Sequence, residues 1–327
     1  LFPDKALAAS CRNLQQQATR SGNKLGITGM FKQVTFIGFG LIGSSMARAI
    51  IEKNLADSIV CVDQSKDVCN TVLALGLADD ATTDPVLGVQ GSDLVVLSTP
   101  VGVMGAVASQ FARHLEEGCI VTDVGSVKTS VIKALQPRLP AKVHLVPAHP
   151  IAGTEFSGPE NGFSELFINR WCILTPQAHT ELKAIEKITK LWEAFGSNVE
   201  IMDAEHHDLV LGITSHLPHL IAYTIVGTAT DLEDDIKSEV IKFSASGFRD
   251  FTRIASSDPT MWRDVFLNNK EAVLEMLQRF NEDLTALQKA IRKQDGDYLY
   301  RHFAETRDIR NAIIDAGQAD YVYPDED

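Results

Sequence analysis

The chain has 327 residues, enough for about two domains that each bury a core. Hydrophobic residues make up 45% and charged residues 22%, which are ordinary globular values and exclude a disordered or collagen-like chain. The 30 Lys and Arg residues against 43 Asp and Glu residues give a net charge of −13, the wrong sign for binding nucleic-acid phosphates or an anionic membrane. We therefore expect a small-molecule ligand.

The longest apolar runs, such as 94–97, are far shorter than the ~20 residues needed to cross a bilayer, so we expect no transmembrane helix. The five cysteines are scattered and include no CxxC pair, which indicates neither a disulfide framework nor a zinc site. Reduced, mostly buried thiols are expected, and with them a cytoplasmic location.

Residues 1–29 differ from the rest of the chain, because they are polar, rich in Gln and lightly basic, and lack the apolar stretch of a secretory signal. We expect a flexible extension here, with Met30 as the natural start. An amphipathic organelle presequence that uses Arg12 and Arg20 is the alternative.

Strand and helix patterns then alternate as far as Met202. The predicted strands of this region are 34–37, 59–62, 94–97, 120–122 and 143–146. Their continuous Val, Ile and Leu runs, with helices between them, predict a parallel sheet covered on both faces. We expect strands 171–174 and 199–201, with a helix over 181–195, to extend the same sheet, so that the first domain spans 30–202.

After Asp203 the strand pattern ends and long helical periodicity follows, with apolar stripes over 209–221 and 273–291. Asp258 followed by Pro259 is a typical helix start, because the carboxylate caps free N–H groups and proline needs no donor there. Apolar stripes on long helices often continue across a subunit boundary. We therefore expect residues 203–327 to form an all-helical domain that makes a homodimer.

A glycine-rich turn stands between the first strand and the first helix. It comprises Gly38, Phe39, Gly40, Leu41, Ile42 and Gly43. In this context the first glycine permits the tight turn, the second lets a pyrophosphate approach the backbone, and the third lets helix and strand pack closely. The pattern predicts a Rossmann-type dinucleotide site; a glycine turn without a ligand is the alternative.

Asp63 ends the next strand, where an acid typically bonds the adenosine ribose hydroxyls and repels a 2′-phosphate. This position predicts NAD rather than NADP, although a simple turn or capping acid is the alternative. Ser98, Thr99 and Pro100 follow the strand 94–97 at the carboxyl edge of the sheet, where ligands bind. A proline there is also a plain helix start.

Two polar blocks, 123–128 (DVGSVK) and 149–155 (HPIAGTE), follow later strands, and we expect both to be loops that open onto the nicotinamide. His149, with an ordinary pKa near ~6.5, can act as a general base toward a hydroxyl, and Ser126 can orient its ring by hydrogen bonding. By position alone, a loop-anchoring histidine is an equal alternative.

Five blocks taken together resemble the prephenate and arogenate dehydrogenases of tyrosine biosynthesis. They are GFGLIGSS, DVGSVK, HPIAGTE, TSHLPH and GFRDFTRIASSDPTMWRD, in this order across residues 31 to about 295. The resemblance implies an NAD-dependent oxidative decarboxylation that yields 4-hydroxyphenylpyruvate or tyrosine, without a metal. His149 would accept the hydroxyl proton while hydride leaves the same carbon for the nicotinamide.

The resemblance also implies a set of substrate-binding residues. Arg253 would bind a substrate carboxylate, since the guanidinium fork suits that group. Asp250 and Glu155 would form an ionic network at the entrance. Trp262 would pack beside Arg253, and His216 would donate to the substrate.

The other basic residues of these blocks receive structural interpretations. Arg249 and Arg263 fit surface ion pairs. His219 fits helix packing, and a metal at His216 and His219 is rejected because no acid or cysteine pair accompanies them. His206 and His207 are interpreted as surface or interdomain residues.

Two other functions are considered. A β-hydroxyacid dehydrogenase of the 6-phosphogluconate or hydroxyisobutyrate type would be expected to use a lysine in its catalytic helix, where this chain has histidines. A non-catalytic NAD-binding sensor would not require His149, Ser126, His216 and Arg253 together. Prephenate or arogenate preference, and feedback inhibition by tyrosine, are not encoded in any feature we can identify.

Overall fold

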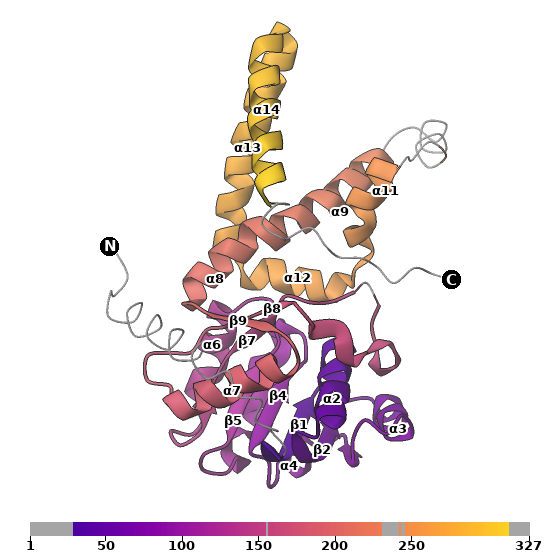
Figure 1. Ribbon diagram of the computed structural model, residues 1–327, viewed down its shortest axis with the longest axis vertical. Coiled ribbons are helices and arrows are strands. Elements are labelled where there is room, and N and C mark those ends of the chain that lie inside the picture. The colour runs from indigo at the N-terminus through magenta and orange to yellow at the C-terminus, as the bar shows by residue number, and fades with distance from the viewer. Residues whose placement is uncertain (1–28, 155, 231–241, 243–245, 314–327) are drawn as a thin grey trace. The chain divides into compact units, whose positions relative to one another are not determined.

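The computed structural model describes residues 29–154, 156–230, 242 and 246–313 (Figure 1). A six-stranded parallel sheet forms the centre of the first part, in the order β3-β2-β1-β4-β5-β6. The strands are β1 (Phe31–Ile37), β2 (Ala56–Val62), β3 (Asp80–Thr82), β4 (Leu94–Leu97), β5 (Ile120–Asp123) and β6 (His144–Leu145). The predicted parallel sheet is thus confirmed. The short β3 was not predicted, because its residues Asp-Ala-Thr carry no apolar run.

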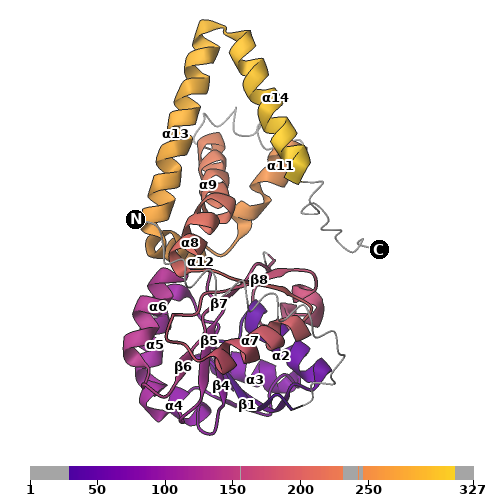
Figure 2. The same ribbon diagram turned by 60° about the vertical axis from the view of Figure 1, so that its left-hand side comes forward.

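Helices cover both faces of this sheet, as Figures 1 and 2 show. They are α2 (Leu41–Lys53), α3 (Lys66–Ala74), α4 (Pro85–Gly88), α5 (Met104–Phe111) and α6 (Thr129–Leu135). Successive strand residues point to opposite faces, so Phe36 joins one buried cluster with Ile50, while Ile37 joins the other with Phe111. The strand order reverses between β1 and β4, and the crevice at their carboxyl ends is where such sheets bind ligands.

Three later strands form a second sheet, β7 (Ala148–Pro150), β8 (Trp171–Leu174) and β9 (Asn198–Ile201), with α7 (Leu182–Ala194) before the last. The expectation that 171–174 and 199–201 extend the first sheet is therefore wrong. Pairing with β5 continues to Val146, whose N–H donates to Val121 O. Pro147 then has no N–H to donate, and the chain leaves the first sheet. β7 instead runs antiparallel to β8, pairing His149 with Ile173.

The described residues after Asp203 form helices and no strand. These are α8 (Ala204–Leu211), a π-helical turn (Gly212–His216), α9 (Leu217–Thr230), α11 (Ser246–Thr252), α12 (Pro259–Asn268), α13 (Lys270–Lys293) and α14 (Gly296–Ile313). Asp258 caps α12 as predicted, since its Oδ1 accepts from Met261 N at 2.8 Å.

The chain divides into two compact units, Leu1–Val273 and Leu274–Asp327. This division comes later than the predicted boundary near Met202, because α8 and α12 pack against helices and turns of the sheet region. Asp208 accepts hydrogen bonds from the first turn of α6, and the carboxylate of Asp264 in α12 lies against Gly102, where an added Cβ would come within 2.6 Å of Asp264 Oδ2.

One helical run, Ala204–Thr230, is long and apolar enough to span a membrane by length and composition, contrary to the expectation from the short apolar runs. A core helix of a soluble protein passes the same test. Here the run contains His207, Asp208 and His216, all buried and hydrogen-bonded within the first unit. These bonds hold the first half of the run, up to His216, within that unit.

The thiols of Cys61, Cys69, Cys119 and Cys172 are free and buried, which confirms the prediction for these four. Cys11, with the rest of the predicted extension up to residue 28, lies outside the described residues.

Candidate active site

The glycine turn has the geometry that a dinucleotide requires. Gly38 has φ +85°, and a Cβ there would meet Thr99 Cγ2 at 2.9 Å. A Cβ on Gly43 would meet Ser98 Oγ at 2.8 Å, while one on Gly40 would meet nothing within 4 Å. Ser98 Oγ also donates to Gly38 O at 2.6 Å, which ties the turn to the end of β4. A ligand can therefore approach the backbone of Gly40, whereas Thr99 and Ser98 leave no room for a side chain at Gly38 or Gly43.

The first turn of α2 faces this open space without a side-chain cap or an acidic residue. Its N–H groups and the positive end of the helix dipole suit a diphosphate. The side chains of Phe39 and Leu41 are buried in the core, and Ile42 is half-buried, so these three residues offer a ligand mainly their backbone. The hydroxyl of Thr99 is buried and has no partner among the described residues. The uncapped helix start, the open Gly40 and the buried Thr99 hydroxyl all fit a bound dinucleotide.

Asp63 is held at the edge of this turn. Its Oδ2 accepts from Phe39 N at 3.2 Å and its Oδ1 from Ser65 N at 2.9 Å. Two backbone donors fix the carboxylate beside the glycine turn and leave acceptor capacity on both oxygens. Asp63 therefore stands where a ribose-binding acid is predicted and also stabilises the turn, which was the alternative role. It is not the cap of α3, because that residue is Ser65.

His149 lies on strand β7 and not in a loop, which corrects the sequence-based expectation, and its side chain is buried. Ala152, three residues later, packs against the large buried cluster that also contains Phe39 and Leu41. Lys128 Nζ donates to Ala148 O at 2.6 Å and pairs with Asp123 at the end of β5, so β7 lies beside the carboxyl edge of the first sheet. The loop that follows continues along α2, where Phe163 N donates to Ser45 Oγ at 3.1 Å.

The ring of His149 is oriented by a second histidine. His149 Nδ1 lies 2.8 Å from His207 Nε2, and the other ring nitrogen of His207 lies 2.9 Å from Asp208 Oδ1. The surface interpretation of His207 is therefore wrong, because it is 0% exposed. The interdomain alternative fits, since His207 in the predicted helical region bonds His149 in the predicted sheet domain. The sequence pattern places neighbours on different helix faces but does not say which face is buried; His206 is the exposed one.

Burial lowers the pKa of His149 well below its ordinary value of 6.5, and the charges of His207, Lys128 and His216 act in the same direction. Burial likewise lowers the pKa of His207, although its bond to Asp208 opposes this. Both rings are neutral at pH 7. A neutral, buried imidazole is the form that can accept a proton.

His216 ends the π-helical turn and is 0% exposed. Its Nδ1 lies 3.0 Å from Asn269 Nδ2, and its Nε2 makes no good hydrogen bond to a described residue, although the Ser126 backbone is close enough to raise its pKa slightly. Burial dominates and lowers the pKa of His216 to about 4. A buried ring nitrogen without a well-formed hydrogen bond indicates a ligand position.

The remaining predicted residues occupy several places. Ser126 is half-buried, and no hydrogen bond joins its hydroxyl to His149 within the described part of the chain, where His207 has the orienting position. Trp262 is buried and stacks on His219 with ring centroids 3.6 Å apart, as the packing prediction for both residues requires. The Trp262 indole N–H has no partner among the described residues.

The basic and acidic residues of the predicted entrance are more exposed. Arg253 begins the short 3-10 helix after α11 and is near enough to His219 to lower its pKa, a smaller effect than burial. Asp250 is exposed and pairs with Arg249 at 3.9 Å. Arg263 pairs with Asp264 at 2.7 Å, in keeping with the ion-pair interpretation. Glu155 lies outside the described residues.

Comparison with known proteins identifies the family. Residues 46–201 match the nucleotide-binding domain of prephenate dehydrogenases, and residues 203–305 match their dimerization domain. A cyclohexadienyl dehydrogenase of Zymomonas mobilis is 46% identical over 284 residues, which covers 87% of this chain and 97% of that protein. The chain belongs to the prephenate dehydrogenase family.

Solved structures of this family share the architecture. Prephenate dehydrogenase from A. aeolicus, in complex with hydroxyphenyl propionate and NAD+, superimposes with a TM-score of 0.81 at 34% identity, covering 86% of this chain and 98% of that one. Synechocystis arogenate dehydrogenase has a TM-score of 0.73 at 26% identity, covering 86% and 99%. This family membership makes the chain an enzyme and decides against the β-hydroxyacid dehydrogenase and the non-catalytic sensor.

Sequence reasoning missed three residues that the structure brings to the site, namely His207, Asp208 and Asn269. A signal existed for the first two, because adjacent His and Asp side chains at a helix start can form a hydrogen-bonded pair. Asn269 carried no signal, since a single Asn between two helices is most often a cap or a surface residue.

Proposed function

We propose that this enzyme oxidises prephenate, arogenate or both with NAD+ and releases 4-hydroxyphenylpyruvate or tyrosine together with carbon dioxide. The observation that carries the proposal is the buried pair formed by His149 and His207 beside the carboxyl edge of the sheet that carries the glycine turn, with His216 hydrogen-bonded in the same network. Support for the substrate class comes from the 46% identical cyclohexadienyl dehydrogenase.

His149 is the general base in this proposal. Its Nδ1 faces His207, so Nε2 is the nitrogen left for the substrate hydroxyl at ring carbon 4. As that proton moves to Nε2, hydride leaves the same carbon. The carboxylate at carbon 1 is lost as carbon dioxide, its electron pair completes the aromatic ring, and the histidine returns the proton to the phenolic oxygen.

The glycine turn, the first turn of α2, Thr99 and Asp63 would hold the dinucleotide. NAD+ supplies the hydride acceptor when it is bound. The two backbone bonds of Asp63 fix a negative charge where a 2′-phosphate would stand, which favours NAD+ over NADP+.

His216, Arg253 and Trp262 would form the substrate side of the site, and Ser126 would help to orient the His149 ring. The Nε2 of His216, which makes no well-formed hydrogen bond to a described residue, suits an acceptor oxygen of the substrate, and the Arg253 guanidinium suits a carboxylate. These roles, and those of Asp250 and Glu155 in an ionic network, rest on the family pattern.

The test is formation of NADH, followed at 340 nm, with prephenate and arogenate, each offered NAD+ and NADP+. The expected result is activity with at least one substrate and a higher kcat/KM with NAD+. A folded protein that binds NAD+ but converts neither substrate would contradict the proposed function. The ratio of the two kcat/KM values gives the substrate preference.

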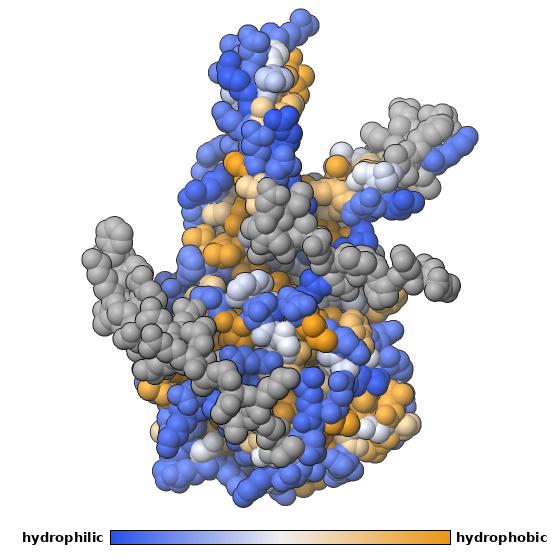
Figure 3. Space-filling view, viewed as in Figure 1, coloured by the Kyte–Doolittle hydropathy of each residue, from blue (hydrophilic) through white to orange (hydrophobic). Residues whose placement is uncertain are grey.

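We also propose a homodimer through the helical unit. No residue of α14 is buried, and Tyr300, Phe303 and Ile309 are each more than half exposed. Figure 2 shows α13 and α14 diverging from the turn that joins them, and Figure 3 shows hydrophobic residues along one side of this helix pair. A second copy of this unit would cover the exposed apolar side chains.

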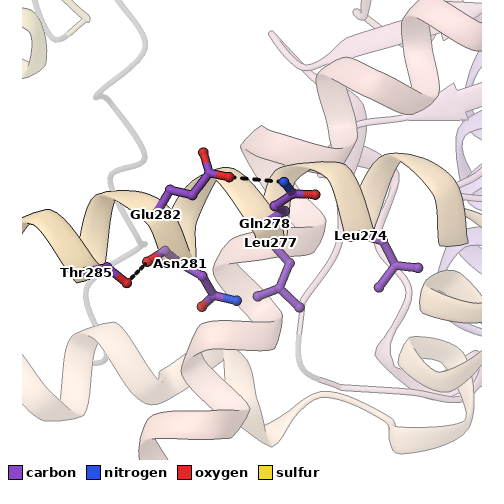
Figure 4. Close-up of a pocket in the computed structure, with 6 residues that line it drawn as sticks. All are labelled: Leu274, Leu277, Gln278, Asn281, Glu282 and Thr285. Carbon is purple, nitrogen blue, oxygen red and sulfur yellow. Dashed lines mark hydrogen bonds between the residues drawn. The ribbon is translucent and has the colours of Figure 1, made fainter.

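A groove of about 610 Å³ runs along one face of α13 in the same unit (Figure 4). Its lining residues are Leu274, Leu277, Gln278, Asn281, Glu282 and Thr285.

Light scattering on the full chain tests the dimer and should give twice the monomer mass. The exposed Leu284→Lys should shift it toward the monomer, and Leu73→Lys on α3 should not. A monomeric wild type at micromolar concentration would contradict the dimer.

A further inference from the structure

Asp208 is the point where the hydrogen bonds of both site histidines meet. Its Oδ1 accepts from Lys128 N at 2.8 Å and its Oδ2 accepts from Thr129 N at 2.9 Å, so the carboxylate caps α6. His207 Nδ1 lies 2.9 Å from Oδ1, and the backbone carbonyl of Asp208 accepts from Asn269 Nδ2 at 2.7 Å. Two branches of hydrogen bonds thus start at Asp208. The first runs from its carboxylate through His207 to His149, and the second runs from its carbonyl through Asn269 to His216.

The first branch fixes the proton on His149. These hydrogen bonds hold the pKa of Asp208 below its ordinary value although burial opposes them, so the group is an anion that only accepts. His207 must therefore carry its proton on Nδ1, and the neutral ring then has an unprotonated Nε2. His149 Nδ1, 2.8 Å away, must be the donor of that bond. His149 Nε2 is left unprotonated, as a base requires.

The second branch fixes the proton on His216 at the opposite nitrogen. Asn269 Nδ2 is assigned as a donor by its bond to the Asp208 carbonyl. An amide nitrogen has no acceptor capacity, so His216 Nδ1, 3.0 Å from it, must be the unprotonated nitrogen. The neutral His216 ring then carries its proton on Nε2, which has no good partner among the described residues.

We propose that Asp208 and Asn269 are positioning residues that hold His149 and His216 in opposite tautomers, with a proton acceptor at His149 Nε2 and a donor at His216 Nε2. The catalytic part of this inference rests on the proposed function, and the tautomers themselves do not. When His149 takes up the substrate proton, the Asp208 carboxylate stabilises the resulting cation through His207.

Asp208→Ala removes the acceptor that holds the His207 proton on Nδ1. His207 can then donate from Nε2 instead, and His149 Nδ1 must accept that proton, so His149 carries its own proton on Nε2. Asp208→Asn would not force this change, because its amide oxygen stays at Oδ1, which also accepts from Lys128 N. A wrong tautomer of this kind costs about 10⁴ in kcat in a serine protease triad. Because both tautomers become populated in Asp208→Ala, we expect a loss of roughly tenfold or more in kcat with little change in KM.

The tautomers are read directly from the ring-nitrogen chemical shifts of the full chain labelled with [¹⁵N]histidine. Wild type should show Nδ1–H at His149 and Nε2–H at His216, and Asp208→Ala should move the His149 proton, wholly or in part, to Nε2. Asp203→Ala is the matched control, because Asp203 caps α8 through His206 N and its side chain bonds neither branch within the described part of the chain. It should change neither the spectrum nor kcat.

Asn269→Asp tests the second branch. The carboxylate would accept from His216 Nδ1–H and leave Nε2 without a proton, so KM for the substrate should rise at least tenfold while kcat changes less. Asn268→Asp is its control, since that side chain bonds the Asp264 carbonyl and not a histidine.

Two further variants keep the test informative if Asp208→Ala does not fold. His207→Gln can still accept from His149 Nδ1 through its amide oxygen and should retain far more kcat than His207→Leu. Equal kcat in those two variants, an Nε2–H signal at wild-type His149, or an unchanged spectrum in Asp208→Ala would overturn the proposal. A wild type with the expected tautomers but no dehydrogenase activity would overturn the proposed function and not the assignment.

Discussion

Lys128 and Asp123 form an ion pair in which both side chains are 0% exposed. The same ammonium group donates to Ala148 O at 2.6 Å, the residue before His149. The pair therefore joins the end of β5 to the strand that carries the proposed base. Each charge depends on the other, since a lone charge in this interior would be costly.

Lys128→Met should lower the free energy of unfolding by about 3–5 kcal/mol, because it leaves the Asp123 carboxylate buried without a counter-charge. The double variant Lys128→Met with Asp123→Asn should recover part of this loss, since both groups are then neutral. Urea unfolding measures both values. A single variant within about 1 kcal/mol of wild type would show that Asp123 is neutral or hydrated without Lys128.

His149→Asn should lower kcat by ~10² to 10⁴, the usual contribution of a general base, which corresponds to about 3–5 kcal/mol in the barrier. NAD+ affinity should stay close to that of wild type. His206→Asn, at an exposed histidine next to the buried His207, is the control and should keep its rate. Retention of most of kcat in His149→Asn would remove this residue from the mechanism.

Asp63→Ser should reduce the preference for NAD+ over NADP+ by an order of magnitude or more, because it removes the charge that opposes a 2′-phosphate. The serine hydroxyl can still bond the Phe39 N–H, so the turn should persist. Kinetics with each cofactor at saturating substrate give the ratio. An unchanged ratio would mean that Asp63 does not face the ribose.

Arg253→Ala should raise KM for the substrate steeply and change kcat less, as expected for a group that binds the carboxylate equally in the ground state and the transition state. Arg249→Ala is the control, since Arg249 is exposed and pairs with Asp250 at 3.9 Å. Similar KM values for the two variants would place the substrate carboxylate elsewhere.

Stability should fall as the pH is lowered from 6.5 toward 4. Burial lowers the pKa of His216 to about 4, and those of His149 and His207 below 6.5, so the unfolded chain binds more protons across this interval. His216 alone accounts for roughly 3 kcal/mol of the fall. Unfolding midpoints in urea between pH 8 and 4.5 measure it, and His216→Gln should show a shallower slope. Equal slopes would show that His216 is protonated in the folded protein.

The sequence by itself determined the parts of this protein that short-range physics controls. A strand, a turn with glycines at fixed spacing and a following helix are local features, so the positions of Gly38, Gly40 and Gly43 defined a dinucleotide site before any coordinates. Apolar periodicity equally defined the parallel sheet and the helical region after Asp203, because burial of one face is recorded in the residues of each element.

Only the tertiary structure decided which elements meet. His149 and His207 are 58 positions apart, Asp208 and Asn269 are 61 apart, and Lys128 and Asp208 are 80 apart. A periodic pattern predicts that a helix has a buried face but not what that face touches, so His207 was assigned to the surface or to an interdomain contact without a role in the site. The second sheet was missed for the same reason, since strand pairing depends on long-range contacts.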